Sequence, residues 1–226
     1  MATIADNLQA IRARIERSAR AVRRDPAEVT LLAVSKGHAL ARIEEARAAG
    51  QGAFGENYVQ EALEKMNALK GLEWHLIGPL QSNKTRVAAE RFAWVQTLAS
   101  EKIARRLSEQ RPAELGALNV LIQVNVSGEA SKAGVAPQQV LLLAEKISSL
   151  KNLRLRGLMA IPEPGADRSR FHEARILFEE LKGRFAFDTL SMGMSEDMEA
   201  AIAERATLVR IGTAIFGARK KERNAA

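Results

Sequence analysis

Short apolar segments alternate with amphipathic segments along nearly all of this 226-residue chain. The apolar segments are rich in Val, Ile and Leu, as is typical of strands buried on both faces. The predicted strands cover 29–34, 53–56, 73–77, 93–97, 118–126, 153–158, 186–190 and 208–211. The predicted helices cover 39–49, 58–69, 83–90, 101–110, 137–149, 168–182 and a segment beginning near Ser195, with a final turn at 213–218. Because helices separate the strands and no hairpin signal occurs, the pattern predicts a parallel sheet.

This rhythm fits a single (β/α)8 barrel of the TIM type, since eight such units in about 200 residues make a compact barrel. An additional amphipathic helix is predicted over 3–24, where apolar residues recur every three or four positions. An open, doubly wound sheet is the alternative, but no Gly-x-Gly-x-x-Gly follows the first strand. No linker divides the chain, so we expect one domain over 1–226, with the helix at 3–24 packed on the barrel.

Composition narrows the class of protein further. Apolar residues make up 46% and charged residues 27% of the chain, as in an ordinary soluble globule. No apolar span approaches the length of a membrane-crossing helix, and the N-terminus lacks the apolar core of a secretory signal. There are no cysteines, which removes disulfides, thiol nucleophiles and thiolate metal sites. We therefore expect a cytoplasmic protein with no membrane partner and no bound metal.

The net charge is +7, which can attract nucleic acid or anionic metabolites. With one tyrosine and two tryptophans, and no basic motif interleaved with aromatics, base stacking is not expected. We favour solvated basic faces and no nucleic-acid partner. RNA binding through the basic N-terminal helix remains a third hypothesis, which a salt-titrated binding curve would test.

The first strand ends in a lysine, within Val29–Lys36 (VTLLAVSK). Alternate side chains of a strand share a face, so Leu32, Val34 and Lys36 should point the same way. At the carboxyl end of a barrel strand, a lysine partly stripped of water has a lowered pKa and can attack an aldehyde. A lysine that merely extends into solvent is the competing interpretation.

Two turns near the C-terminus suit an anion. In these barrels, phosphate groups often bind in the loops after strands 7 and 8. Ser191–Ser195 (SMGMS) follows the seventh predicted strand, and Gly212–Thr213 follows the eighth. Their small residues let backbone N–H groups approach an anion, although helix capping and tight turns would also explain them. Arg210 lies within the last apolar strand, where a buried guanidinium needs a ligand or an acidic partner.

A lysine, a phosphate cradle and an inward arginine together are typical of a site for pyridoxal 5′-phosphate (PLP). The chain resembles the YggS/PROSC family of pyridoxal phosphate homeostasis proteins in six blocks that span most of its length. These are 31–36 (LLAVSK), 54–58 (FGENY), 74–84 (WHLIGPLQSNK), 157–162 (GLMAIP), 191–198 (SMGMSEDM) and 209–217 (VRIGTAIFG).

The resemblance implies a fold similar to the alanine racemase barrel domain and gives each candidate residue a role. Lys36 would carry PLP as a Schiff base, Arg210 would face the pyridine nitrogen, and Asn57 would lie close to the cofactor. The phosphate-binding segments would contain Ser191, Ser195, Gly212 and Thr213. For His75, a core imidazole and a cofactor contact are both open, and Lys84 and Lys132 are further amines that could take the aldehyde.

The resemblance further implies a carrier or buffer of PLP that acts in vitamin B6 and amino-acid homeostasis without efficient catalysis. An arginine at the ring nitrogen makes the cofactor a poorer electron sink. Alanine racemase takes a second base, a tyrosine, from a second domain, and this chain stops soon after Phe216 with Tyr58 as its only tyrosine. A slow PLP-dependent racemase or related enzyme is the alternative. We expect a monomer whose partners are PLP and, as a further hypothesis, PLP-dependent apoenzymes.

Overall fold

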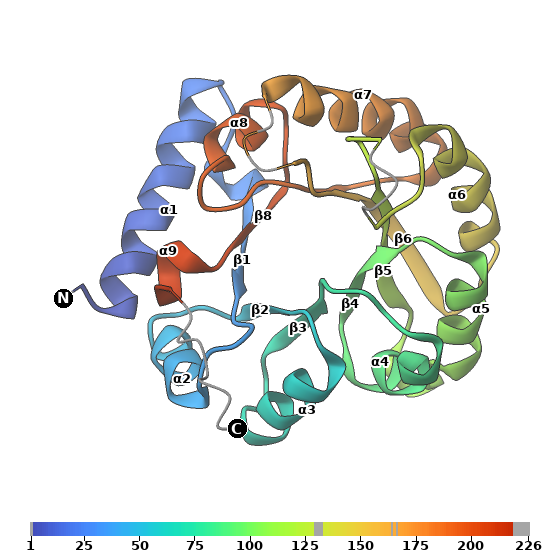
Figure 1. Ribbon diagram of the computed structural model, residues 1–226, viewed down its shortest axis with the longest axis horizontal. Coiled ribbons are helices and arrows are strands. Elements are labelled where there is room, and N and C mark those ends of the chain that lie inside the picture. The colour runs from blue at the N-terminus through green and yellow to red at the C-terminus, as the bar shows by residue number, and fades with distance from the viewer. Residues whose placement is uncertain (1, 129–132, 164, 166, 219–226) are drawn as a thin grey trace, which may run out of the picture.

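In the residues described by the computed structural model (2–128, 133–163, 165 and 167–218), eight parallel strands form a closed barrel in the order of the chain (Figure 1). The strands are β1 (Thr30–Val34), β2 (Ala53–Glu56), β3 (Glu73–Leu76), β4 (Trp94–Leu98), β5 (Leu118–Val124), β6 (Leu153–Ala160), β7 (Thr189–Ser191) and β8 (Leu208–Ile211). Pairing of β8 with β1 closes the ring. This closure confirms the predicted (β/α)8 barrel and rules out the open sheet.

Helices surround the strands, as Figure 1 shows. They are α1 (Ile4–Ala21), α2 (Leu40–Ala48), α3 (Val59–Ala68), α4 (Thr85–Arg91), α5 (Glu101–Gln110), α6 (Val140–Ser148), α7 (Arg168–Phe185), α8 (Met198–Ala203) and α9 (Thr213–Phe216). Within the described ranges, none of them is both long and apolar enough to cross a bilayer.

The additional N-terminal helix is confirmed, but it is shorter than the predicted 3–24. Thr3 caps α1 reciprocally with Asp6, and the helix gives way to Val22 and then to Arg23, which has a left-handed φ of 55°. That reversal ends the helix. The apolar stripe of α1 is buried, and the helix contacts α2, α8 and α9 beside the closing strands (Figure 1).

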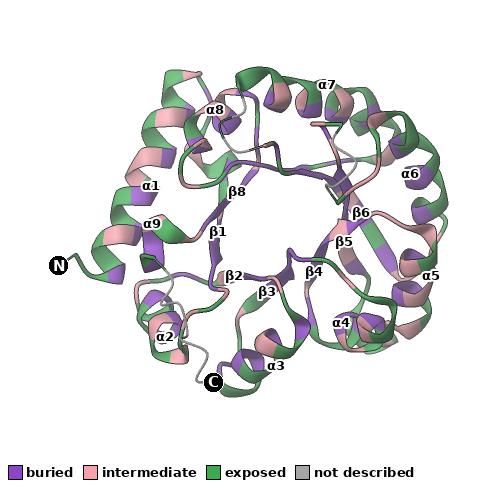
Figure 2. Ribbon diagram, in the orientation of Figure 1, coloured by how far each residue is buried: buried purple, intermediate pink, exposed green. Residues whose placement is uncertain are grey.

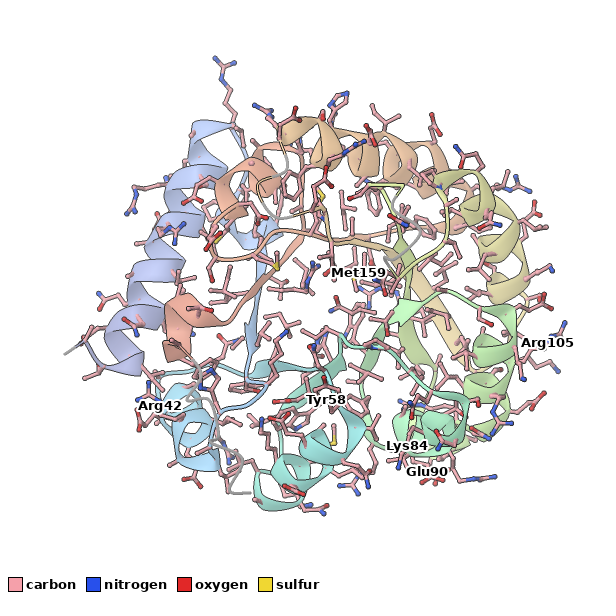
Figure 3. All side chains as sticks on the ribbon, in the orientation of Figure 1. Arg42, Tyr58, Lys84, Glu90, Arg105 and Met159 are labelled. Carbon is pink, nitrogen blue, oxygen red and sulfur yellow. The ribbon has the colours of Figure 1, made fainter. Side chains whose placement is uncertain are left out.

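The core has two layers, because the two faces of each strand pack against different partners. The outer layer lies between the strands and the helices, whose inward faces are buried while their outward faces are exposed (Figure 2). The inner layer consists of two clusters inside the barrel. One contains Leu32, Val34, Ile77 and Leu208, and the other contains Trp94, Leu121 and Met159, the last labelled in Figure 3.

The seventh unit departs most from the predicted bounds. The helix predicted over 168–182 continues to Phe185, and Ala186 then reverses the chain with a left-handed φ of 52°. The strand predicted over 186–190 is therefore the shorter β7, and the helix expected near Ser195 begins at Met198. Phe187 lies outside the strand, and its apolar ring is buried against Phe178 and Phe185 instead.

Candidate functional site

Lys36 lies two residues beyond the end of β1, at the carboxyl-end mouth of the barrel. The side chains of Leu32 and Val34 belong to the inner cluster, which confirms that this face of β1 points into the barrel. Ser35 points the opposite way, since its hydroxyl bonds Glu56 in the layer below the helices. Lys36 itself is partly buried. Continued alternation from Leu32 and Val34 predicts that the Lys36 amine also lies on the inner face of the mouth.

The turn after β8 lies against the same strand end. Ala33 pairs with Ile211, so the following residues, Val34 and Gly212, are neighbours. A Cβ added to Gly212 would lie 3.2 Å from the Val34 carbonyl oxygen, closer than side chains normally approach. The glycine thus permits a close approach between the segment that leads to Lys36 and the predicted phosphate-binding turn.

The turns after β7 and β8 also meet. The Ala214 amide N–H donates to Ser195 Oγ at 3.4 Å, which places Ser195 beside Gly212 and Thr213. Thr213 is exposed and Ser195 is partly buried, so their hydroxyls lie near solvent. The structure therefore brings together three of the four residues predicted to hold a phosphate.

Ser191, the fourth, lies elsewhere. It ends β7 inside the barrel, where it is fully buried. Its hydroxyl accepts a hydrogen bond from Arg210 at 2.7 Å and donates one to Gln96 Oε1 at 2.7 Å. The geometry gives Ser191 a role in holding Arg210, and its place in the phosphate-binding set stays a prediction.

Arg210 points into the barrel from β8 with 4% of its surface exposed. Its guanidinium donates to Ser191 Oγ and to the Ala160 carbonyl oxygen at 2.9 Å. Among the residues that the structure describes, no carboxylate pairs with it directly. Burial lowers the pKa of Arg210 to about 10, an effect that the charge of Asp197 partly opposes, so the group stays cationic at neutral pH. The predicted alternative of a salt bridge to a neighbouring acid is thus not what satisfies it.

Asn57 follows β2. It lies level with Lys36, because each is two residues beyond a member of the Val34–Gly55 pair. Its backbone packs directly on the turn after β3. A Cβ added to Gly78 would lie only 2.2 Å from the Asn57 carbonyl oxygen. Gly78 is therefore required for Asn57 to sit at the mouth.

The chemical groups of these residues fit an anionic aldehyde. The set comprises the predicted amine of Lys36, the buried cation of Arg210 and a narrow turn of small residues that a larger side chain at Gly212 would crowd. Lys36 follows β1, Arg210 lies on β8, Ser195 lies in the loop after β7, and Gly212 and Thr213 follow β8. The predicted amine and the predicted phosphate-binding turns thus lie at neighbouring strand ends.

Comparison with known proteins places the chain. Residues 7–220 match the family model of the alanine racemase N-terminal domain. The chain is 59% identical over 223 residues to the pyridoxal phosphate homeostasis protein of Pseudomonas aeruginosa, with 97% of each chain covered. The chain belongs to the family of pyridoxal phosphate homeostasis proteins.

Two solved structures extend the comparison. PipY of Synechococcus elongatus, solved with PLP bound, is 37% identical to this family member, with a TM-score of 0.82 and 95% and 100% of the two chains covered. Alanine racemase of Clostridium difficile has a TM-score of 0.74 at 10% identity, and the match covers 92% of this chain but 59% of the racemase. At that identity the racemase shows the shared barrel alone.

A buried polar chain that the sequence did not reveal supports Arg210 in this family member. Gln96 accepts from Ser191 and its amide nitrogen contacts His75 Nδ1 at 2.8 Å, while His75 Nε2 contacts Glu73 at 2.8 Å. The sequence does contain one sign of this chain of contacts, because Gln96 is a polar residue within an otherwise mainly apolar strand, as Arg210 is in β8. Burial lowers the pKa of His75, whose ring stacks on Trp94. These contacts support the prediction of a core imidazole over that of a cofactor contact.

The remaining candidate groups lie at the rim or outside the described residues. Lys84 ends a short 3-10 helix, η2 (Ser82–Lys84), and is partly buried. Tyr58 caps α3 with 67% of its surface exposed and is labelled in Figure 3. Lys132 is not among the described residues, so its predicted role as an alternative amine is untested.

Proposed function

We propose that this protein binds PLP covalently, as a Schiff base on Lys36, and acts as a carrier or buffer in vitamin B6 and amino-acid homeostasis. The observation that carries the proposal is the buried Arg210, a cation without a carboxylate partner in the described chain, on the strand that pairs with the lysine strand. The relatedness to PipY, which was solved with PLP bound, and the names of the relatives support it.

The bound cofactor supplies an aldehyde, and the chain supplies the amine. On binding, the Lys36 nitrogen would add to the aldehyde carbon with loss of one water, so that a C=N bond would replace the C=O bond. No oxidant or reductant is needed. The reaction reverses when water returns, as a carrier requires, and Ser195, Gly212 and Thr213 would retain the phosphate during the exchange.

Arg210 is the reason that we propose a carrier rather than an efficient enzyme. With a pKa of about 10, its guanidinium is protonated at neutral pH and cannot accept a proton from the pyridine ring. A ring nitrogen that stays unprotonated is a weaker electron sink, which disfavours chemistry that needs a carbanion. Racemisation also needs a base on each face, and the only tyrosine, Tyr58, lies exposed at the rim.

The experiment is a visible spectrum of the purified protein with PLP, before and after borohydride treatment. The wild type should show the absorption band of a Schiff base, and reduction to a secondary amine should fix the cofactor mass on the peptide that contains Lys36. Lys36→Ala should lose the band and the fixed mass. An unchanged spectrum in Lys36→Ala would reject the assignment.

Turnover separates the carrier from a slow racemase. Purified protein with PLP, incubated with each amino acid in deuterated water, should exchange the α-hydrogen no faster than free PLP does. Exchange well above that level, lost in Lys36→Ala, would favour the enzyme. Size-exclusion chromatography with light scattering should give a monomer of 1–226 that behaves as one domain.

A further inference from the structure

A buried charge cluster lies on the outer side of β1 and β2, next to the residues that flank Lys36. The Lys65 ammonium group of α3 donates to three oxygens: Glu56 Oε1 at 2.7 Å, Glu61 Oε1 at 2.6 Å and the Ser35 carbonyl oxygen at 2.8 Å. The side chain of Lys65 is 7% exposed and that of Glu56 is fully buried. We call Glu56, Glu61 and Lys65 the clamp.

The clamp contacts the chain on both sides of Lys36. Before it, the Ser35 hydroxyl donates to Glu56 Oε1 at 2.5 Å, and the Ser35 carbonyl accepts from Lys65. After it, the Gly37 amide N–H donates to Glu61 Oε1 at 2.5 Å. The clamp thus holds the residues immediately before and after Lys36.

The turn lies outside the ladder of β1 and is closed by a backbone hydrogen bond from the His38 amide to the Ser35 carbonyl oxygen at 3.1 Å, and the clamp adds side-chain contacts to it. The strand ends at Val34, and the last ladder-type bond is that from the Ser35 amide to the Gly55 carbonyl at 3.0 Å. Gly37 then takes a left-handed φ of 69°, which glycine adopts without strain but does not by itself fix. Reaction of an amine with a held aldehyde depends steeply on position, and displacement by about 1 Å can lower a rate a hundredfold.

Stability alone is a weak reason for the clamp. Desolvation of a buried ion pair often exceeds its attraction, so apolar residues of similar volume would be as good or better. Glu56 Oε2 is buried and has no hydrogen-bond partner among the described residues, and burial raises the pKa of Glu56 although Lys65 opposes this. An unsatisfied charge of this kind is expected where geometry, rather than stability, is being maintained.

We propose that Glu56, Glu61 and Lys65 are positioning residues that hold the Ser35–Gly37 turn, and thereby aim the Lys36 amine at the aldehyde of PLP. The inference rests on the proposed function, since it assigns these residues to the formation of the Schiff base on Lys36. It adds a requirement from α3 to a site otherwise built from the strand ends and the two C-terminal turns.

The test is the rate of Schiff-base formation, followed by visible absorbance after apo-protein is mixed with PLP. Glu61→Ala, which removes the acceptor of Gly37 from a partly exposed position, should slow formation about tenfold or more and alter the visible band. Glu61→Gln keeps an oxygen that can accept from Gly37 and should restore much of the rate. The double variant Lys65→Met/Glu56→Gln, which leaves no lone buried charge, should be slow as well.

Glu101→Ala is the matched control. Glu101 begins α5 across the barrel, its side chain is 30% exposed against 27% for Glu61, and it also pairs with basic residues. It should leave the rate unchanged, with a melting temperature like that of Glu61→Ala.

Wild-type rates and bands in Glu61→Ala and in the double variant, with the band still lost in Lys36→Ala, would overturn the clamp and leave the proposed function standing. Equal slowing in Glu101→Ala would also overturn it. A wild-type protein with no band at all would instead reject the proposed function and the clamp with it.

Discussion

Replacing Arg210 with methionine tests whether the buried cation is present for a ligand or for stability. Burial lowers its pKa to about 10, from an ordinary value above about 12. Because one pKa unit corresponds to about 1.4 kcal/mol, burying this charge opposes folding by about 3 kcal/mol. A base with a lowered folded-state pKa opposes folding at every pH below that value, so the penalty is fully present at neutral pH.

The hydrogen bonds of Arg210 return a similar amount. Its contacts with Ser191 Oγ and the Ala160 carbonyl contribute about 1.5 kcal/mol each, as is usual for a charged donor. The two effects nearly cancel, and methionine fills much of the same volume. The free energy of unfolding of Arg210→Met should therefore lie within about 1 kcal/mol of the wild type. Stabilisation by added PLP should be strongly reduced.

The assay is urea unfolding of apo-protein, followed by the fluorescence of the buried Trp74 and Trp94. Leu208→Ala is the matched control, since Leu208 is buried on the same inner face of β8, and this truncation should cost about 2–5 kcal/mol. Should Arg210→Met lose as much stability as Leu208→Ala, the arginine would be a structural requirement and the reasoning would be refuted. Undiminished stabilisation by PLP would refute the assignment of Arg210 to the cofactor.

Three further predictions follow from single contacts. Gly78→Ala should lower the free energy of unfolding by about 2 kcal/mol or more and weaken PLP binding, because the new Cβ would lie 2.2 Å from the Asn57 carbonyl; unchanged urea unfolding and cofactor titrations would contradict this. Burial lowers the pKa of His75, so unfolding takes up a proton and stability should fall as the pH drops below about 6.5. His75→Gln should reduce that loss between about pH 7 and pH 5 in urea titrations, and an identical pH dependence would count against the assignment. Thr3→Ala removes the cap of α1 and should cost about 1 kcal/mol in thermal unfolding without affecting PLP binding.

Local patterns in the chain were sufficient to predict the barrel. The apolar runs and the helical stripes report burial directly, because a strand alternates faces and a helix repeats every three or four residues. The buried face of α1, from Ile4 to Ala19, and the inward direction of Leu32 and Val34 follow from those periods. Parallel topology alone predicts the end of the barrel at which Lys36 and the two C-terminal turns lie, because all of them follow the carboxyl ends of strands.

The limits of the strands and helices needed tertiary structure. Phe187 looked like part of a strand because it is apolar, but its burial comes from packing on α7. Likewise α1 ends at Ala21, just before the left-handed Arg23, although its apolar pattern predicts a helix to residue 24. Neither outcome follows from the apolar pattern, which indicates burial but not where the backbone reverses.

The sequence by itself determined which face of each strand a residue occupies, since alternation is a local property of a strand. Only the tertiary structure decided what each of them touches. It turned the Ser191 hydroxyl toward Arg210 and brought Lys65 of α3 against the carbonyl of Ser35, thirty positions earlier in the chain. Contacts of this kind depend on how whole strands and helices pack, and the same residue types in the same order would allow other pairings.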